Sequence, residues 1–88
     1  MRLLGLYARE GDQGAFSTLV SRHMGWVYAA CKRGLRDRHL AEDAAQAVFL
    51  TLARRAKSIS PKVRLSGWLF KTTRFAVADA RKREGEDA

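Results

Sequence analysis

The most regular pattern of apolar and polar residues in the chain lies between residues 40 and 56. The apolar positions recur with the spacing of one helix face and are Leu40, Ala41, Ala44, Ala45, Val48, Phe49, Leu52, Ala53 and Ala56. Asp37, just before this stripe, is placed to accept hydrogen bonds from the free backbone N–H groups of a first helical turn. Basic residues follow at the other end, where the helix dipole favours positive charge. The pattern therefore predicts an amphipathic helix over residues 39–57.

Weaker patterns predict further helices within residues 1–38. A short apolar segment indicates a first helix that stops at Gly11, and Asp12 is then positioned to cap a second helix. The second helix is expected to extend to about residue 35, with a bend or a restart near Gly25.

The end of the chain predicts one more helix. Residues 58–64 are expected to form a loop that contains the single proline, Pro61. A final helix is expected over residues 65–83, and residues 84–88 are expected to be a frayed end. Its core-facing positions are Leu65, Trp68, Leu69, Thr72, Thr73, Ala76 and Ala80. Because no segment alternates with the period of a strand, the sequence predicts an all-α fold, a compact bundle of about four to five helices.

Length and charge narrow the class of protein. The 88 residues are enough for one domain, with 47% apolar residues and a net charge of +8. No acid occurs from Ala44 to Ala78, whereas this segment holds Arg54, Arg55, Lys57, Lys62, Arg64, Lys71 and Arg74. A solvated surface usually mixes its signs, so a long segment of one sign favours a nucleic-acid partner.

Several other classes lack support in the sequence. No apolar stretch approaches the roughly 18–20 residues that span a bilayer, and membrane insertion is not expected. His23 and His39 have no other ligands at metal-binding spacing, and no glycine-rich phosphate loop is present. The single cysteine, Cys31, is expected to be a buried hydrophobe in a reducing cytoplasm. The sequence predicts a protein that is not an enzyme and has no cofactor.

The last third of the chain combines features that single-stranded nucleic acid requires. Cations suited to phosphates lie near aromatic residues on which bases stack, namely Trp68, Phe70 and Phe75, and near a short polar loop. Trp68 stands at a core-facing position and is expected mainly in the core. Phe70 and Phe75 lie off the stripe, so their exposure distinguishes a binding surface from a core. These residues alone predict a small helical nucleic-acid binder.

The order of three motifs resembles region 2 of a bacterial RNA polymerase sigma factor, and most closely the extracytoplasmic-function (ECF) group of the sigma-70 family. The motifs are residues 11–23 (GDQGAFSTLVSRH), residues 41–50 (AEDAAQAVFL) and residues 67–74 (GWLFKTTR), followed by Asp79 and the basic residues 81–83. The resemblance covers nearly the whole chain, from about Leu3 to Arg83.

The resemblance implies partners and site residues. Helix 39–57 would dock on the clamp helices of the polymerase β′ subunit, through Asp43, Gln46, Ala47 and Phe49, with Phe49 mainly in the core. Loop 58–64 would capture a base flipped out of the promoter −10 element, and helix 65–83 would line the melting strand. The implied DNA-binding residues are Ser58, Ser60, Lys62, Arg64, Trp68, Lys71, Arg74, Phe75, Arg81 and Lys82.

Two departures from the family pattern leave alternatives open. Ala47 stands where the family usually has an acid, and Phe75 stands where it often has asparagine. A sigma-like module that binds an anti-sigma factor or another regulator without promoter function is one alternative. A general helical binder of duplex DNA is another, and a membrane-surface helix is a distant one. Sigma factors of this group continue into a second domain that recognises the −35 element, so the 88 residues are expected to be one domain of a longer protein.

Overall fold

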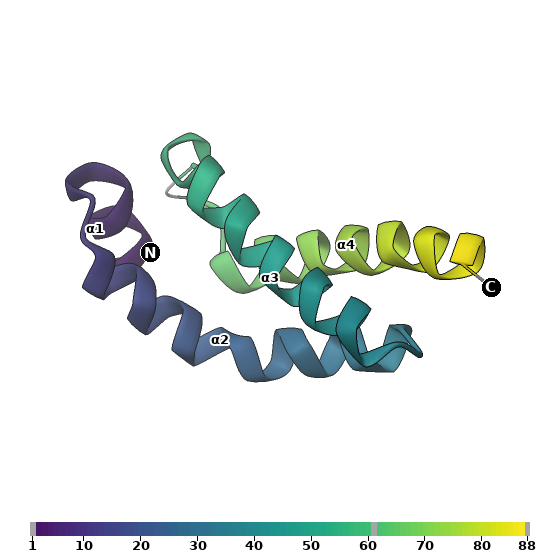
Figure 1. Cartoon of the computed structure of the whole chain (residues 1–88). Helices are drawn as coiled ribbons and strands as arrows, with labels where there is room; N and C mark the ends of the chain where they lie inside the picture. Colours follow the sequence, from purple (N-terminus) through teal and green to yellow (C-terminus); the bar gives the residue numbers. More distant parts are fainter. Residues whose placement is uncertain (1, 61, 88) are drawn as a thin grey trace.

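The computed structural model describes residues 2–60 and 62–87, with the surroundings of side chains given for residues 3–60 and 62–85. Pro61 of the predicted loop therefore lies outside the described residues. The elements are α1 (Arg2–Glu10), α2 (Gln13–Gly34), α3 (Arg38–Arg55), the 3-10 helix η1 (Ala56–Ser58) and α4 (Leu65–Asp87) (Figure 1). The predicted all-α fold is confirmed, and no strand occurs in the described part.

The helix starts follow from side-chain caps. Asp12 Oδ1 accepts a hydrogen bond from the Ala15 N–H at 3.0 Å, which satisfies a free donor at the start of α2. Asp37 Oδ1 accepts hydrogen bonds from the N–H groups of His39 and Leu40 at 2.7 and 3.3 Å, and thereby caps α3. Both predicted caps are confirmed.

Two helices are longer than their sequence pattern predicts. α2 is a single helix of 22 residues that continues through Gly25, so of the two expected alternatives the restart does not occur. α4 continues to Asp87, past its predicted end at Arg83. The cause at α4 is a long-range contact, because a Glu84 carboxylate oxygen accepts hydrogen bonds from the N–H groups of Arg36 and Asp37 at 3.0 and 2.9 Å.

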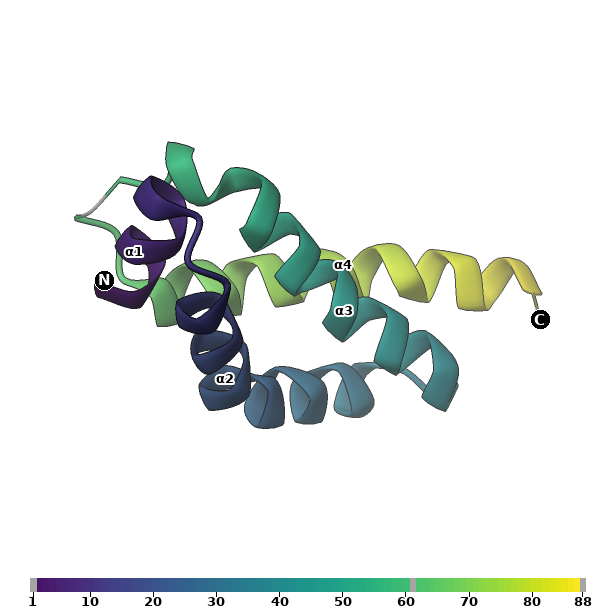
Figure 2. The same ribbon diagram turned by 60° about the vertical axis from the view of Figure 1, so that its left-hand side comes forward.

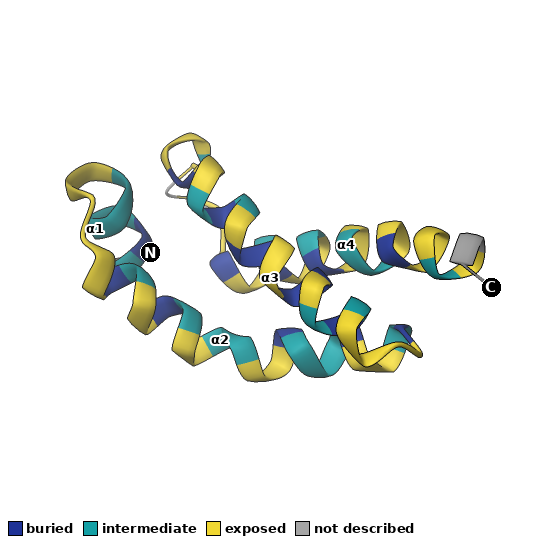
Figure 3. Ribbon diagram, in the orientation of Figure 1, coloured by how far each residue is buried: buried dark blue, intermediate teal, exposed yellow. Residues whose placement is uncertain are grey.

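α3 forms the centre of the bundle. It contacts both α2 and α4, while α1 packs against α2 and η1 (Figure 2). The most deeply buried side chains come from α2, α3 and α4 and are Leu19, Val27, Cys31, Val48, Leu52 and Leu69. Buried positions of this kind follow the helices where they approach one another (Figure 3). The apolar stripe of α3 is thus the middle of the core, as predicted.

α2 and α4 approach closely at Gly34. A Cβ atom placed on Gly34 would lie 2.5 Å from Val77 Cγ1, well inside the van der Waals contact distance. The absence of a side chain at Gly34 therefore allows the end of α2 to pack directly against α4.

Candidate nucleic-acid interface

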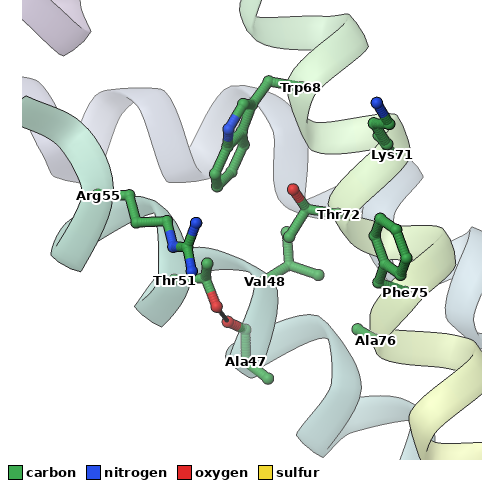
Figure 4. A pocket seen from close by; sticks show the side chains of 9 residues that line it. All are labelled: Ala47, Val48, Thr51, Arg55, Trp68, Lys71, Thr72, Phe75 and Ala76. Atoms are coloured by element: carbon green, nitrogen blue, oxygen red, sulfur yellow. Dashed lines mark hydrogen bonds between the residues drawn. The ribbon is translucent and has the colours of Figure 1, made fainter. Parts of the chain in front are cut away.

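An open groove of about 600 Å³ lies between α3 and α4. Its lining is Ala47, Val48, Thr51 and Arg55 from α3, and Trp68, Lys71, Thr72, Phe75 and Ala76 from α4 (Figure 4). Within each helix the lining residues are one, three or four positions apart, so each set shares one helix face. The floor is small or aliphatic, whereas Arg55, Trp68, Lys71 and Phe75 supply the large side chains.

The aromatic side chains of α4 are not all part of the core. Phe75 is 69% exposed and Phe70 is 57% exposed, so neither is explained by packing. Trp68 is half-buried and packs against the core cluster, while it also lines the groove. Trp68 was predicted to lie mainly in the core, and the structure shows that it contacts both the core and the groove.

The cations of the groove have no acidic partner among the described side chains. The ion pairs within residues 3–60 and 62–85 join Glu42 to Arg38 and His39, and Asp79 to Arg83. Arg55 and Lys71 are both exposed and remain available to an anion. The groove thus offers positive charge beside an aromatic ring.

The predicted DNA-binding residues of α4 fall on two sides of the helix. Trp68, Lys71 and Phe75 face α3 across the groove. Arg74 and Arg81 instead line a second depression, of about 300 Å³, together with Phe70 of α4 and Ala30 of α2. Lys82 is exposed and lines neither depression.

The loop residues lie near one end of the groove. Ser58 is the last residue of η1, not part of the open loop, and its hydroxyl donates to the Arg55 carbonyl oxygen at 2.9 Å. Ser60 Oγ accepts a hydrogen bond from the Lys62 N–H at 3.2 Å. The side chains of Lys62 and Arg64 are exposed. Ser58 is therefore already engaged, whereas the two cations are free for a ligand.

The outer face of α3 carries a row of exposed residues that adjoins the groove at Ala47. Asp43, Gln46 and Ala47 are exposed there, as the predicted docking positions require. Phe49 is only 5% exposed and belongs to the core, so its side chain offers no docking surface. Leu50, which is 57% exposed, is the large apolar side chain on this face.

Sequence reasoning missed three residues at these surfaces. Leu50 lies off the apolar stripe and three residues after Ala47, so its helical position could have revealed it. Thr51 and Arg55 stand four and eight residues after Ala47 and therefore share its face. Arg55 was expected as one cation of the acid-free segment and at a helix end, but not as a residue that lines a groove with α4.

The described residues give little support for a metal site, a reactive cysteine or a membrane-spanning helix. No group of three or more histidine, cysteine, aspartate or glutamate side chains could hold a metal ion there. Burial raises the pKa of the Cys31 thiol, which makes this side chain a poor nucleophile. Among these same residues, none of the helices has the length and apolar character needed to cross a membrane.

Comparisons with known proteins agree with the architecture. Residues 19–86 match the family model described as Sigma-70 region 2. The chain is 36% identical over 76 residues to RNA polymerase sigma factor CarQ of Myxococcus xanthus, which covers 86% of this chain and 44% of that protein. It is 31% identical over 77 residues to ECF RNA polymerase sigma factor SigW of Bacillus subtilis (strain 168), which covers 86% of this chain and 41% of that protein.

The chain thus spans less than half the length of these two curated relatives. No solved structure gave a significant match. The prediction that the chain is not an enzyme agrees with the family, which is not enzymatic. The matched segment includes α3, α4 and both surfaces described above. The chain belongs to the sigma-70 region 2 family, with an ECF sigma factor among its relatives.

Proposed function

We propose that this chain joins RNA polymerase to promoter DNA during transcription initiation. In this proposal the outer face of α3 docks on the β′ clamp helices of the polymerase core. The loop and α4 bind the single-stranded −10 region and help to hold it melted. The observation that carries the proposal is the exposure of two aromatic rings, Phe70 and Phe75, in the acid-free first part of α4, in a chain of the sigma-70 region 2 family.

The docking half of the proposal is supported by the exposed row on α3. Asp43 and Gln46 present polar groups, and Leu50 adds an apolar contact beside Ala47. Interfaces commonly combine a central apolar contact with a polar rim. Ala47 offers no polar group where the family usually has an acid, so we expect Asp43 and Leu50 to contribute most of the docking energy.

The DNA half is supported by charge and aromatic exposure together. Phosphates provide most of the affinity of nucleic-acid binding, and bases stack on exposed rings. Lys62, Arg64, Lys71 and Arg74 are exposed cations along the loop and α4. We propose that these cations bind the strand and that the aromatic side chains hold its bases.

The alternatives are less well supported. A module that only binds an anti-sigma factor would be favoured by complete burial of the aromatic residues, but Phe70 and Phe75 are largely exposed. An anti-sigma protein remains a proposed additional partner of the same surfaces. A general duplex binder needs cations but has no use for exposed rings, because bases in a duplex are already stacked. The proposed function would place the chain in the bacterial cytoplasm.

The direct test is capture of an isolated β′ clamp-helix fragment by the immobilised chain. We expect the parent to retain the fragment and an Asp43→Arg, Gln46→Ala variant to lose it, because the change reverses a charge at the centre of the docking face. Glu10→Arg is the matched control, since it makes the same charge reversal on an exposed residue of α1. Equal capture by the parent and the Asp43 variant would contradict the docking face, and capture by neither would contradict polymerase binding.

A further inference from the structure

The α3–α4 groove connects two surfaces to which the proposed function gives different partners. Arg55 and Thr51 come from the helix proposed to dock on polymerase, whereas Lys71 and Phe75 come from the helix proposed to bind DNA. Figure 4 shows the side chains of both helices around one common space. The structure therefore places an α3 cation where a ligand of α4 would also meet it.

We infer that this groove is a pocket for one unpaired nucleobase of the bound strand. Phe75 is the stacking wall of this pocket, and Arg55 and Lys71 bind the phosphates on either side of the base. The inference rests on the proposed binding of single-stranded DNA. It adds a second base site to the one expected at loop 58–64, and it assigns a DNA contact to α3.

The lining of the groove matches a nucleotide in size and chemistry. Ala47, Thr51, Thr72 and Ala76 are small, so they leave a space beside the Phe75 ring in which a flat group fits. The ring is 69% exposed, which leaves its face available for stacking. The two cations have no acidic partner among the described side chains, so a phosphate would supply the missing negative charge.

An acidic amphipathic helix is the principal competing ligand. Such a helix would bury a row of several apolar side chains and would need a correspondingly long apolar strip. The groove offers mainly one exposed ring and the half-buried Trp68 between small residues. This short aromatic site with two cations favours a nucleobase and its phosphates over a helix.

Phe75 also determines how this pocket would discriminate among bases. A phenylalanine ring has no hydrogen-bonding group, so it cannot distinguish the edges of the bases. It distinguishes them by stacking area, which is larger for a purine than for a pyrimidine. The asparagine that is common at this position in the family could bond a base edge instead. We therefore expect this chain to prefer a purine in the groove but to tolerate either purine.

The test uses the 88-residue chain and a 12-nucleotide dT strand that carries one 2-aminopurine, whose fluorescence falls when it stacks. Phe75→Leu removes the ring while it keeps an apolar side chain. We expect it to weaken binding between about 5- and 100-fold and to abolish the fluorescence change. The salt dependence of binding should not change, because no cation is lost. Trp26→Leu is the matched control, since it also replaces an exposed aromatic side chain by leucine, on α2 and outside the groove.

Arg55→Gln tests the phosphate contact from α3. We expect the slope of log affinity against log salt concentration to decrease by about 0.7, the value for one phosphate of a single strand. Arg54→Gln is the control, because Arg54 is an exposed neighbour that lines a different depression. Both arginines are exposed, so circular dichroism should show an unchanged fold in each variant.

The outcomes separate this inference from the proposed function. If Phe75→Leu binds like the parent while Lys71→Gln and Arg74→Gln bind more weakly, the strand binds but the base pocket is wrong. An equal loss in Trp26→Leu would also overturn the pocket. If polyglutamate binds as tightly as the strand and depends equally on Phe75, the groove is a site for an acidic peptide. If the parent binds no strand, both the inference and the proposed DNA binding are wrong.

Discussion

The side of α4 that faces α2 and the side that faces α3 differ in how the helices meet. On the α2 side, Gly34 allows backbone and Val77 to pack without an intervening side chain, and Glu84 bonds the turn that follows α2. On the α3 side, buried residues such as Val48 and Leu69 form a core whose outer edge opens into the groove. The comparison indicates that α4 packs on α2 through a close local contact at Gly34, whereas its packing on α3 leaves an open groove along the edge.

The largest expected effect on stability comes from a substitution on the inner face of α4, compared with one on its outer face. Leu69 is fully buried, and Leu69→Ala should lower the free energy of unfolding by about 2–5 kcal/mol through lost burial and a cavity. Phe70→Ala, one residue further on, should change it by no more than about 0.5 kcal/mol, because the ring is exposed. Urea denaturation measures both values. Similar losses in the two variants would mean that Phe70 belongs to the core.

The next effect tests the close approach of α2 and α4. Gly34→Val should lower the free energy of unfolding by about 1–3 kcal/mol, because the added side chain overlaps Val77. Val77→Ala in the same chain should recover part of the loss by making room. Gly25→Val is a suitable control, since a Cβ atom there meets no other atom within 4 Å. If the Gly34 and Gly25 variants are equally stable, the contact does not constrain α4.

A smaller effect is expected at the C-terminal part of α4. Glu84→Ala removes the acceptor of the Arg36 and Asp37 N–H groups, and we expect a loss of about 0.5–1.5 kcal/mol in the free energy of unfolding. Glu84→Gln keeps an oxygen acceptor and should lose less. Thermal denaturation of the two variants checks this order. A larger loss in the glutamine variant would contradict the hydrogen-bonded role.

The smallest effects on stability are expected from replacing the cations on the two sides of α4. Lys71 lines the groove and Arg74 the depression beside α2, and both side chains are exposed. Lys71→Gln and Arg74→Gln should each leave stability within about 0.5 kcal/mol and each reduce the salt slope of single-strand binding by about 0.7. Fluorescence anisotropy at several salt concentrations measures the slopes. A change in only one variant would confine the strand to that side of α4.

Local chemistry was sufficient to predict much of the fold. The caps at Asp12 and Asp37 and the apolar stripe of α3 depend on residues a few positions apart, and the structure confirms them. The full length of α4 was not predictable in this way. It depends on a hydrogen-bond acceptor, Glu84, whose donors lie 47 and 48 residues earlier in the chain.

In the candidate site, too, features set by nearby residues were predictable and features set by helix packing were not. The exposure of Asp43 and Gln46 followed from their position off the stripe, and the burial of Phe49 followed from its position on it. The placement of Arg55 and Phe75 along one groove did not follow, because it depends on where α3 and α4 cross. Their roles in binding polymerase or DNA remain predictions, to be tested by the variants above.

The hydrogen bonds of Glu84 have a consequence for the order in which the domain opens. The Arg36 and Asp37 N–H groups lose their hydrogen-bond acceptor as soon as the last turns of α4 separate from the α2–α3 turn. Helix ends open more often than whole domains, so these two amides should exchange with deuterium earlier than the amides within α3. Their exchange rates would therefore report the detachment of one end of α4 while the centre of the bundle stays folded.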